Sequence, residues 1–235
     1  MMDCRIADLL VRLDADGKTA RQAEPYRVSA CSGPPDMVVT CDPRQVMAAN
    51  DWIENLDVAQ YMGTGAAFAK NLLHFSGFQL HASAVELAGR AYLFSGPCGI
   101  GKSTHAERWI RLFGAIPLND DKPAIRRLDT LWMAYGTPWS GKRDLSRPVG
   151  VPMGTLVFLR RGEENQMERL TAGKALPLFL SQTPRTLLWE GMERLLTLAD
   201  QFLREIPVWR LTCRNEDEAA YLARKSVCPE EHTEE

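Results

Sequence analysis

The stretch GPCGIGKST, residues 96–104, carries the strongest pattern in the sequence. Gly96, Gly101, Lys102 and Ser103 have the spacing G-x-x-x-x-G-K-[ST] of a phosphate-binding loop, or P-loop. Glycines let the backbone turn so tightly that successive N–H groups point inward and form a cradle for anionic oxygens. The motif predicts that a phosphate group is bound, but by itself it does not identify the substrate.

Two side chains of this loop can contact a bound nucleotide and its metal ion. Lys102 can reach the β- and γ-phosphates of a nucleotide, and the Ser103 hydroxyl can ligate Mg²⁺. The loop is therefore predicted to hold a nucleotide together with Mg²⁺. The residues predicted to bind the nucleotide are Gly96, Pro97, Cys98, Gly99, Ile100, Gly101, Lys102, Ser103 and Thr104.

The segments around the loop follow the order strand, loop, helix. FQLHASAVEL (78–87) and RAYLFS (90–95) flank a short Ala-Gly turn and are predicted to pair, and the second strand runs directly into the loop. HAERWIRLFG (105–114) then has apolar residues at helical spacing. This order puts the loop at the amino end of a helix, where phosphate binding requires it.

Two more hairpins are predicted after the loop. AIPLND (115–120) predicts a buried strand that ends in acids, and PAIRRL with LWMAYG predicts a hairpin around 129–130. TLVFLRR (155–161) and QMERL (166–170) predict another. Most P-loop nucleotidases build a parallel sheet from β-α-β repeats, so these hairpins predict an α/β fold with a mixed β-sheet flanked by helices.

The pattern divides the chain into three parts. Residues 1–70 mix short apolar runs with turn-rich segments before a helical pattern, which predicts accessory strands and a helix packed on the core. Residues 71–228 form the predicted P-loop domain. Residues 229–235 hold four glutamates and are predicted to be a frayed acidic tail.

Composition narrows the classes of partner. The chain has 235 residues, of which 45% are hydrophobic and 25% charged, so it can bury a sizeable core. A formal net charge of -2 gives no basic field for nucleic acid, and no apolar run is long enough to span a membrane. Its six cysteines lack a C-x-x-C pair. We expect a cytoplasmic protein with free thiols. The sequence does not decide whether the chain forms a homo-oligomer.

The segment NDDK (119–122) supplies carboxylates at the end of the predicted strand. A P-loop kinase needs a carboxylate there to hold Mg²⁺, and transfer to a hydroxyl gains from a base that accepts its proton. Asp120 and Asp121 are therefore predicted as catalytic residues, with Asp120 and Ser103 as Mg²⁺ ligands. Which aspartate is the base stays open, and a polar turn before Pro123 is the alternative.

Other candidates flank this pair. His81 lies in the strand before the loop strand, where it is either structural or catalytic. YGTPWSGKR (135–143) could fold over bound phosphate, or it could be a hairpin exit with solvated cations. The residues predicted to contact phosphate or substrate are Lys122, Trp139, Lys142 and Arg143, with Trp139 excluding water and Lys142 or Arg143 neutralising transferred charge.

LHASAVELAGRAYLFSGPCGIGKST followed by NDDK resembles the C-terminal kinase domain of HPr kinase/phosphorylase, including its small uncharacterised bacterial relatives in the PEP-carboxykinase-like P-loop group. In that family a histidine lies at the same distance from the first glycine of the loop, and paired aspartates follow. The resemblance covers about residues 78–160. It implies a mixed sheet, ATP and Mg²⁺, with His81 near the nucleotide and the aspartate pair at the reacting oxygen. YGTPWSGKR occupies roughly the place of the family's glycine-rich protein-binding segment.

These observations predict an ATP-dependent kinase that uses Asp120, Asp121, His81 and Lys102 to phosphorylate a hydroxyl. The acceptor is a protein, a peptide or a small molecule, and a serine-type hydroxyl is favoured. The alternative is an ATP-binding regulatory or scaffold protein with little turnover. The aspartate pair separates the two, because a sensor needs one carboxylate for Mg²⁺ whereas hydroxyl phosphorylation gains from a second.

Overall fold

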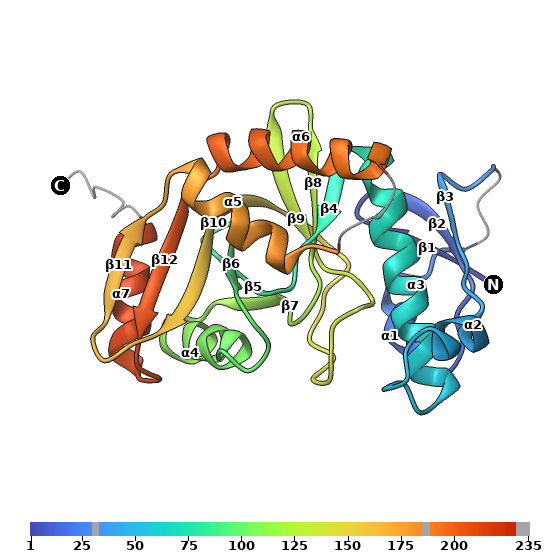
Figure 1. Ribbon diagram of the computed structural model, residues 1–235, viewed down its shortest axis with the longest axis horizontal. Coiled ribbons are helices and arrows are strands. Elements are labelled where there is room, and N and C mark those ends of the chain that lie inside the picture. The colour runs from blue at the N-terminus through green and yellow to red at the C-terminus, as the bar shows by residue number, and fades with distance from the viewer. Residues whose placement is uncertain (30–32, 185–188, 229–235) are drawn as a thin grey trace.

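Two β-sheets and the helices around them make up the molecule (Figure 1). The computed structural model describes residues 1–29, 33–184 and 189–228. It is a mixed α/β protein with a large curled mixed sheet, so this part of the predicted fold class is confirmed. The acidic segment predicted to be frayed, 229–235, lies outside the described residues. None of the helices in the described residues is long and apolar enough to cross a bilayer.

The smaller sheet comes from the N-terminal part of the chain. Strands β1 and β2 pair antiparallel across Ala7 and Asp8, whose φ values of 53° and 58° suit a tight hairpin turn, and β3 adds to β2 in parallel. The long helix α3 begins where the Asn55 side chain accepts a hydrogen bond from the Val58 N–H. The elements of this part are β1 (Met2–Ile6), β2 (Leu9–Leu13), α1 (Gly17–Ala23), η1 (Glu24–Tyr26), β3 (Met37–Val39), α2 (Pro43–Ala48), α3 (Leu56–Leu72) and η2 (Leu73–Phe75).

The larger sheet has nine strands in the order β4-β8-β9-β10-β6-β5-β7, with β12 on β10 and β11 on β12. The central strands β6, β10 and β12 are parallel to one another, and the remaining pairs are antiparallel. The strands are β4 (Gly77–Gln79), β5 (Ala82–Leu87), β6 (Arg90–Ser95), β7 (Ile116–Asn119), β8 (Ala124–Leu128), β9 (Leu131–Tyr135), β10 (Gly150–Arg161), β11 (Gln166–Arg169) and β12 (Val208–Cys213).

Two of the three predicted hairpins are confirmed. Strands β5 and β6 pair across Ala88 and Gly89, both with positive φ, and β8 pairs with β9 across Asp129. The third hairpin is wrong, because β12 lies between β10 and β11 and pairs with both of them. The alternating pattern of these segments identifies them as strands, but it does not say which strand lies beside which.

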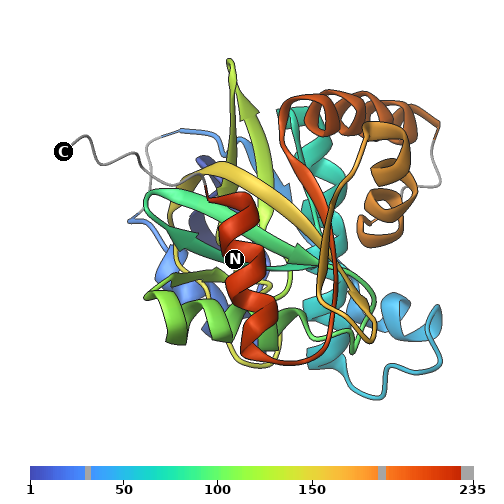
Figure 2. The same cartoon turned by 90° about the vertical axis from the view of Figure 1, so that its left-hand side faces the viewer.

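Helices cover both faces of the larger sheet, as Figures 1 and 2 show. Successive side chains of β6 point to opposite faces. Leu93 belongs to the core cluster with α5 and α6, whereas Tyr92 and Phe94 belong to the cluster with α4 and α7. The four helices are α4 (Lys102–Phe113), α5 (Ala172–Gln182), α6 (Trp189–Glu205) and α7 (Asp217–Val227).

Trp139 joins the segment after β9 to helix α3. Its indole is fully buried, stacks on the Phe68 ring with 4.7 Å between centroids, and donates a hydrogen bond from Nε1 to Thr64 Oγ1 at 3.2 Å. A Cβ on Gly65 would lie 3.0 Å from Trp139 Cδ1, which is tighter than most real contacts, so a larger residue there would require the ring to shift. The prediction that Trp139 shields bound phosphate is therefore wrong, because the apolar face of α3 already buries its ring.

Replacing Trp139 with alanine should lower the free energy of unfolding by about 3–5 kcal/mol, because it leaves a large cavity and removes the hydrogen bond that the indole donates to Thr64 Oγ1. Trp189→Ala is the matched control, since Trp189 is 80% exposed and should change stability by less than about 0.5 kcal/mol. Urea unfolding of both variants measures the difference. Equal stability of the two variants would contradict this role for Trp139.

Candidate active site

Strand β5 brings the three candidate segments together. It pairs antiparallel with β6, so that Ala82 faces Ser95, and antiparallel with β7, so that Ala84 faces Asn119. The start of β5 therefore lies beside the ends of both neighbours. As a result His81, the 96–104 loop and the aspartate pair meet at one edge of the sheet.

The 96–104 loop turns at three glycines. Gly96, Gly99 and Gly101 have φ values of 147°, 76° and 110°, a region that side chains other than glycine rarely adopt. Gly96 also packs closely, because a Cβ there would lie 3.2 Å from the Leu159 carbonyl oxygen. Helix α4 begins within the last residues of this segment, at Lys102. The first N–H groups of α4 lack helical partners and are therefore available to an anion.

Lys102 is buried within this loop. Its Nζ donates hydrogen bonds to the carbonyl oxygens of Gly96 at 2.9 Å and Pro97 at 3.2 Å. Burial lowers the pKa of Lys102, and the negative potential of Cys98 and the two aspartates opposes that shift. The ammonium group is thus held at the centre of the loop by two neutral acceptors that a phosphate oxygen could replace.

Asp120 is directed toward two serines. Ser83 Oγ donates to Asp120 Oδ1 at 3.1 Å and lies 3.3 Å from Ser103 Oγ. Burial raises the pKa of Asp120, while hydrogen bonds from Ser103 and Ser83 and the charge of Arg143 oppose the rise. A carboxylate and a hydroxyl so close together suit Mg²⁺, which binds through one or two protein oxygens and takes the rest from water and phosphate.

Asp121 is directed toward His81. Nε2 of His81 lies 3.4 Å from Asp121 Oδ1. Burial lowers the pKa of His81, the charge of Lys102 lowers it further, and Asp121 opposes both. The imidazole is therefore more easily kept neutral than a histidine in water, and its Nε2 lies close enough to Asp121 to limit how that carboxylate can turn.

Asn119 explains how two successive aspartates both reach the site. Neighbouring residues of a strand point to opposite faces, so one of them would be lost if the strand continued. Strand β7 ends at Asn119, whose buried Oδ1 accepts hydrogen bonds from the N–H groups of Asp121 at 3.0 Å and Lys122 at 2.8 Å. This local turn redirects the backbone immediately after the strand.

The predicted cations have different surroundings. Arg143 pairs with Glu107 at 3.4 Å and lines a small cavity with Ser103 and Asp120. The Nζ of Lys122 lies 5.7 Å from the centre of the Tyr61 ring, and burial lowers its pKa. Lys142 is exposed and makes no side-chain hydrogen bond or ion pair to the described residues. Arg143 and Lys122 are therefore at the site, and Lys142 is at its surface.

Sequence reasoning missed two side chains of the site. Ser83 shares a strand face with His81, two residues away, and this alternation was the one signal that could have identified it. Tyr61 comes from α3, and its hydroxyl accepts a hydrogen bond from the Gly141 N–H at 3.0 Å. Gly141 packs against Asp121, because a Cβ there would lie 3.1 Å from Asp121 Cβ. Residues before position 70 thus border the site, which no local pattern could reveal.

A cavity of about 640 Å³ adjoins the outer side of the 96–104 loop. Arg108, Arg161 and Arg214 line it, and Arg161 donates a hydrogen bond to the Gly99 carbonyl oxygen at 2.7 Å. Ile100 and Leu159 add apolar surface. The cavity is large enough for a small organic group attached to a phosphate in the loop.

Comparison with known proteins gives a distant likeness among solved structures. No protein-family model and no curated protein matches the sequence. Among solved structures, the Hpr(Ser) kinase/phosphatase from Coxiella burnetii matches with a TM-score of 0.39 and 11% sequence identity. The match covers 63% of this chain and 95% of that one.

Proposed function

We propose that this chain is an ATP-dependent kinase that transfers the γ-phosphoryl group of ATP to a hydroxyl, with a serine-type acceptor favoured. The divergence of the two aspartates supports this proposal most strongly. Asp120 is directed to Ser83 and Ser103, whereas Asp121 is directed to His81. Binding a nucleotide needs only one carboxylate for Mg²⁺, so a second carboxylate beside a histidine suits proton transfer.

The 96–104 loop would hold the phosphates of ATP. The N–H groups at the start of α4 favour anionic oxygens, and Lys102 would exchange its carbonyl acceptors for phosphate oxygens. That exchange is favourable because hydrogen bonds between charged groups are roughly twice as strong as neutral ones. The adjoining cavity of about 640 Å³ would then receive the nucleoside.

Asp120 and Ser103 would hold Mg²⁺. When bound there, Mg²⁺ would supply positive charge against the phosphates of ATP. Ser83 donates a hydrogen bond to Asp120, so it would orient this carboxylate toward the ion. Arg143 lies on the same side and would add positive charge near the transferred group.

Asp121 would accept the proton of the acceptor hydroxyl. As the hydroxyl oxygen bonds to the γ-phosphorus, the bond from that phosphorus to the β-γ bridging oxygen breaks and ADP leaves. The proton moves from the hydroxyl to the carboxylate of Asp121. His81 lies 3.4 Å from this carboxylate and would keep it in the orientation that the transfer needs.

Incubation with γ-labelled ATP tests the proposal directly. Serine, small hydroxyl metabolites and serine-containing peptides are offered as acceptors, and the location of the label is determined. We expect the label in one of these acceptors. Label that is released only as inorganic phosphate, with every acceptor unlabelled, would instead support the regulatory or scaffold alternative.

Asp121→Asn should lower the rate of phosphoryl transfer at least about 100-fold, because general-base catalysis contributes roughly 10²–10⁴. The affinity for ATP with Mg²⁺ should change less than about twofold, since Asp121 is directed to His81 rather than to the loop serines. Asp129→Asn is the control, because Asp129 is exposed in the β8–β9 turn, where asparagine fits equally well. Transfer at the rate of the unsubstituted chain in Asp121→Asn would refute the assignment.

Lys102→Ala should weaken ATP binding about 10- to 100-fold, because it removes a charged hydrogen-bond donor worth about 1.5–3 kcal/mol. Lys70→Ala removes an exposed lysine of α3 and should leave the affinity unchanged. Calorimetric titration of each folded variant with ATP measures the difference. If both variants bound ATP as the unsubstituted chain does, Lys102 would have no role at the phosphates.

A further inference from the structure

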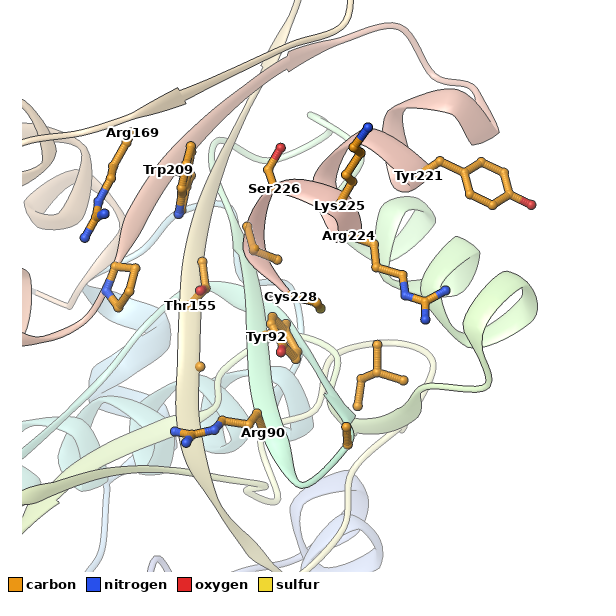
Figure 3. Close-up of a pocket in the computed structure, with 15 residues that line it drawn as sticks. Arg90, Tyr92, Thr155, Arg169, Trp209, Tyr221, Arg224, Lys225, Ser226 and Cys228 are labelled. Carbon is orange, nitrogen blue, oxygen red and sulfur yellow. The ribbon is translucent and has the colours of Figure 1, made fainter. Parts of the chain in front are cut away.

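A cavity of about 1130 Å³ lies where β6 and β12 begin, beside the C-terminal half of α7 (Figure 3). Its lining comes from five strands and one helix: Leu87 ends β5, Arg90 starts β6, Thr155 lies on β10, Arg169 ends β11, Trp209 lies on β12, and α7 supplies most of the remaining side chains. We call this surface the cationic groove. The lining side chains that matter here are Arg90, Arg169, Trp209, Tyr221, Arg224 and Lys225.

The cationic groove is separate from the candidate active site. Arg90 is the first residue of β6, whereas the 96–104 loop follows its last residue, Ser95. A strand of this length spans about 20 Å at roughly 3.3 Å per residue. A molecule in the groove would therefore bind at the opposite end of the strand from the loop, and its binding does not depend on the nucleotide chemistry proposed above.

The charge of the groove is unbalanced. Among the residues that the structure describes, its lining holds four cations and no aspartate or glutamate. Within residues 1–29, 33–184 and 189–228, none of these four cations forms an ion pair with a carboxylate. Many other arginines of the chain are paired, among them Arg12, Arg111 and Arg147. The groove therefore favours an anionic occupant.

The apolar part of the groove indicates what else the occupant carries. Tyr221 is 54% exposed, Trp209 is half-buried, and Leu87 and Pro207 add aliphatic surface. Exposed aromatic rings beside arginines are typical of protein–protein interfaces. The volume also exceeds the range of about 300–1,000 Å³ that is usual for small-molecule sites. A peptide backbone with both acidic and apolar side chains matches this surface.

We propose that the cationic groove binds a segment of a partner protein in which glutamates or aspartates alternate with apolar residues. The acids would pair with Arg90, Arg169 and Lys225. Arg224 would add positive charge beside them, and its guanidinium carbon lies 4.8 Å from the centre of the Phe113 ring. Apolar residues of the segment would pack on Trp209 and Tyr221.

Fluorescence anisotropy with a short labelled peptide of glutamates and leucines tests this. The full chain should bind the peptide, more weakly as salt is added. Arg90→Glu/Lys225→Glu should weaken binding at least about tenfold. The matched control is Arg44→Glu/Lys70→Glu, which changes the net charge equally at two exposed positions of α2 and α3 and should bind as the unsubstituted chain does. Thermal melting confirms that both variants are folded.

Several outcomes would overturn the proposal. The first is no binding by the full chain, and the second is an equal loss in both double variants. A third is groove-dependent binding of a single-stranded oligonucleotide in place of the peptide. A fourth is a dimer of the full chain that only the groove variant dissociates, which would assign the groove to a second copy. A fifth is peptide binding only after removal of 229–235, which would assign it to the chain itself.

Discussion

The site depends on one constraint, which is that β5 has a partner on each edge. Strand β6 carries the loop at its end, and β7 carries the aspartates at its end. Both run antiparallel to β5, so their ends must meet at its beginning. A βαβ unit would also bring loop and acids to one edge, but it would not place a third strand's first residues between them. His81 and Ser83 take part in the site for this reason.

Asn119 connects the end of β7 to the segment that follows β9. It is fully buried, and its amide has partners on both sides. The oxygen accepts from the backbone of Asp121 and Lys122, while the nitrogen donates to the Thr137 carbonyl oxygen at 2.9 Å. Thr137 in turn donates from its hydroxyl to the Lys122 carbonyl oxygen at 2.7 Å. The turn that directs the acids and the segment that carries Arg143 are thus fixed to one another.

The sequence pattern predicted those features that are determined by residues close together in the chain. The loop glycines, the β5–β6 and β8–β9 hairpins and the proximity of His81 to the aspartates follow from spacing along the sequence or from a resemblance based on it. The position of β12 between β10 and β11 could not be predicted in this way, because strand propensity does not say which other strand a segment pairs with. The burial of Trp139 was missed for a similar reason. Its position after glycine and proline resembles an exposed loop, and only α3, some seventy residues earlier, makes it part of the core.

The contact between Trp139 and Gly65 has a consequence for how such sequences can diverge. The indole fills the space that a side chain at position 65 would need, and its nitrogen is satisfied by a threonine one residue before that glycine. A larger residue at position 65 would require the ring to shift, and a smaller residue at position 139 would leave a void. Homologous chains that retain this packing should therefore either keep the tryptophan together with the glycine or exchange both. The two positions would covary even though neither touches the reacting groups.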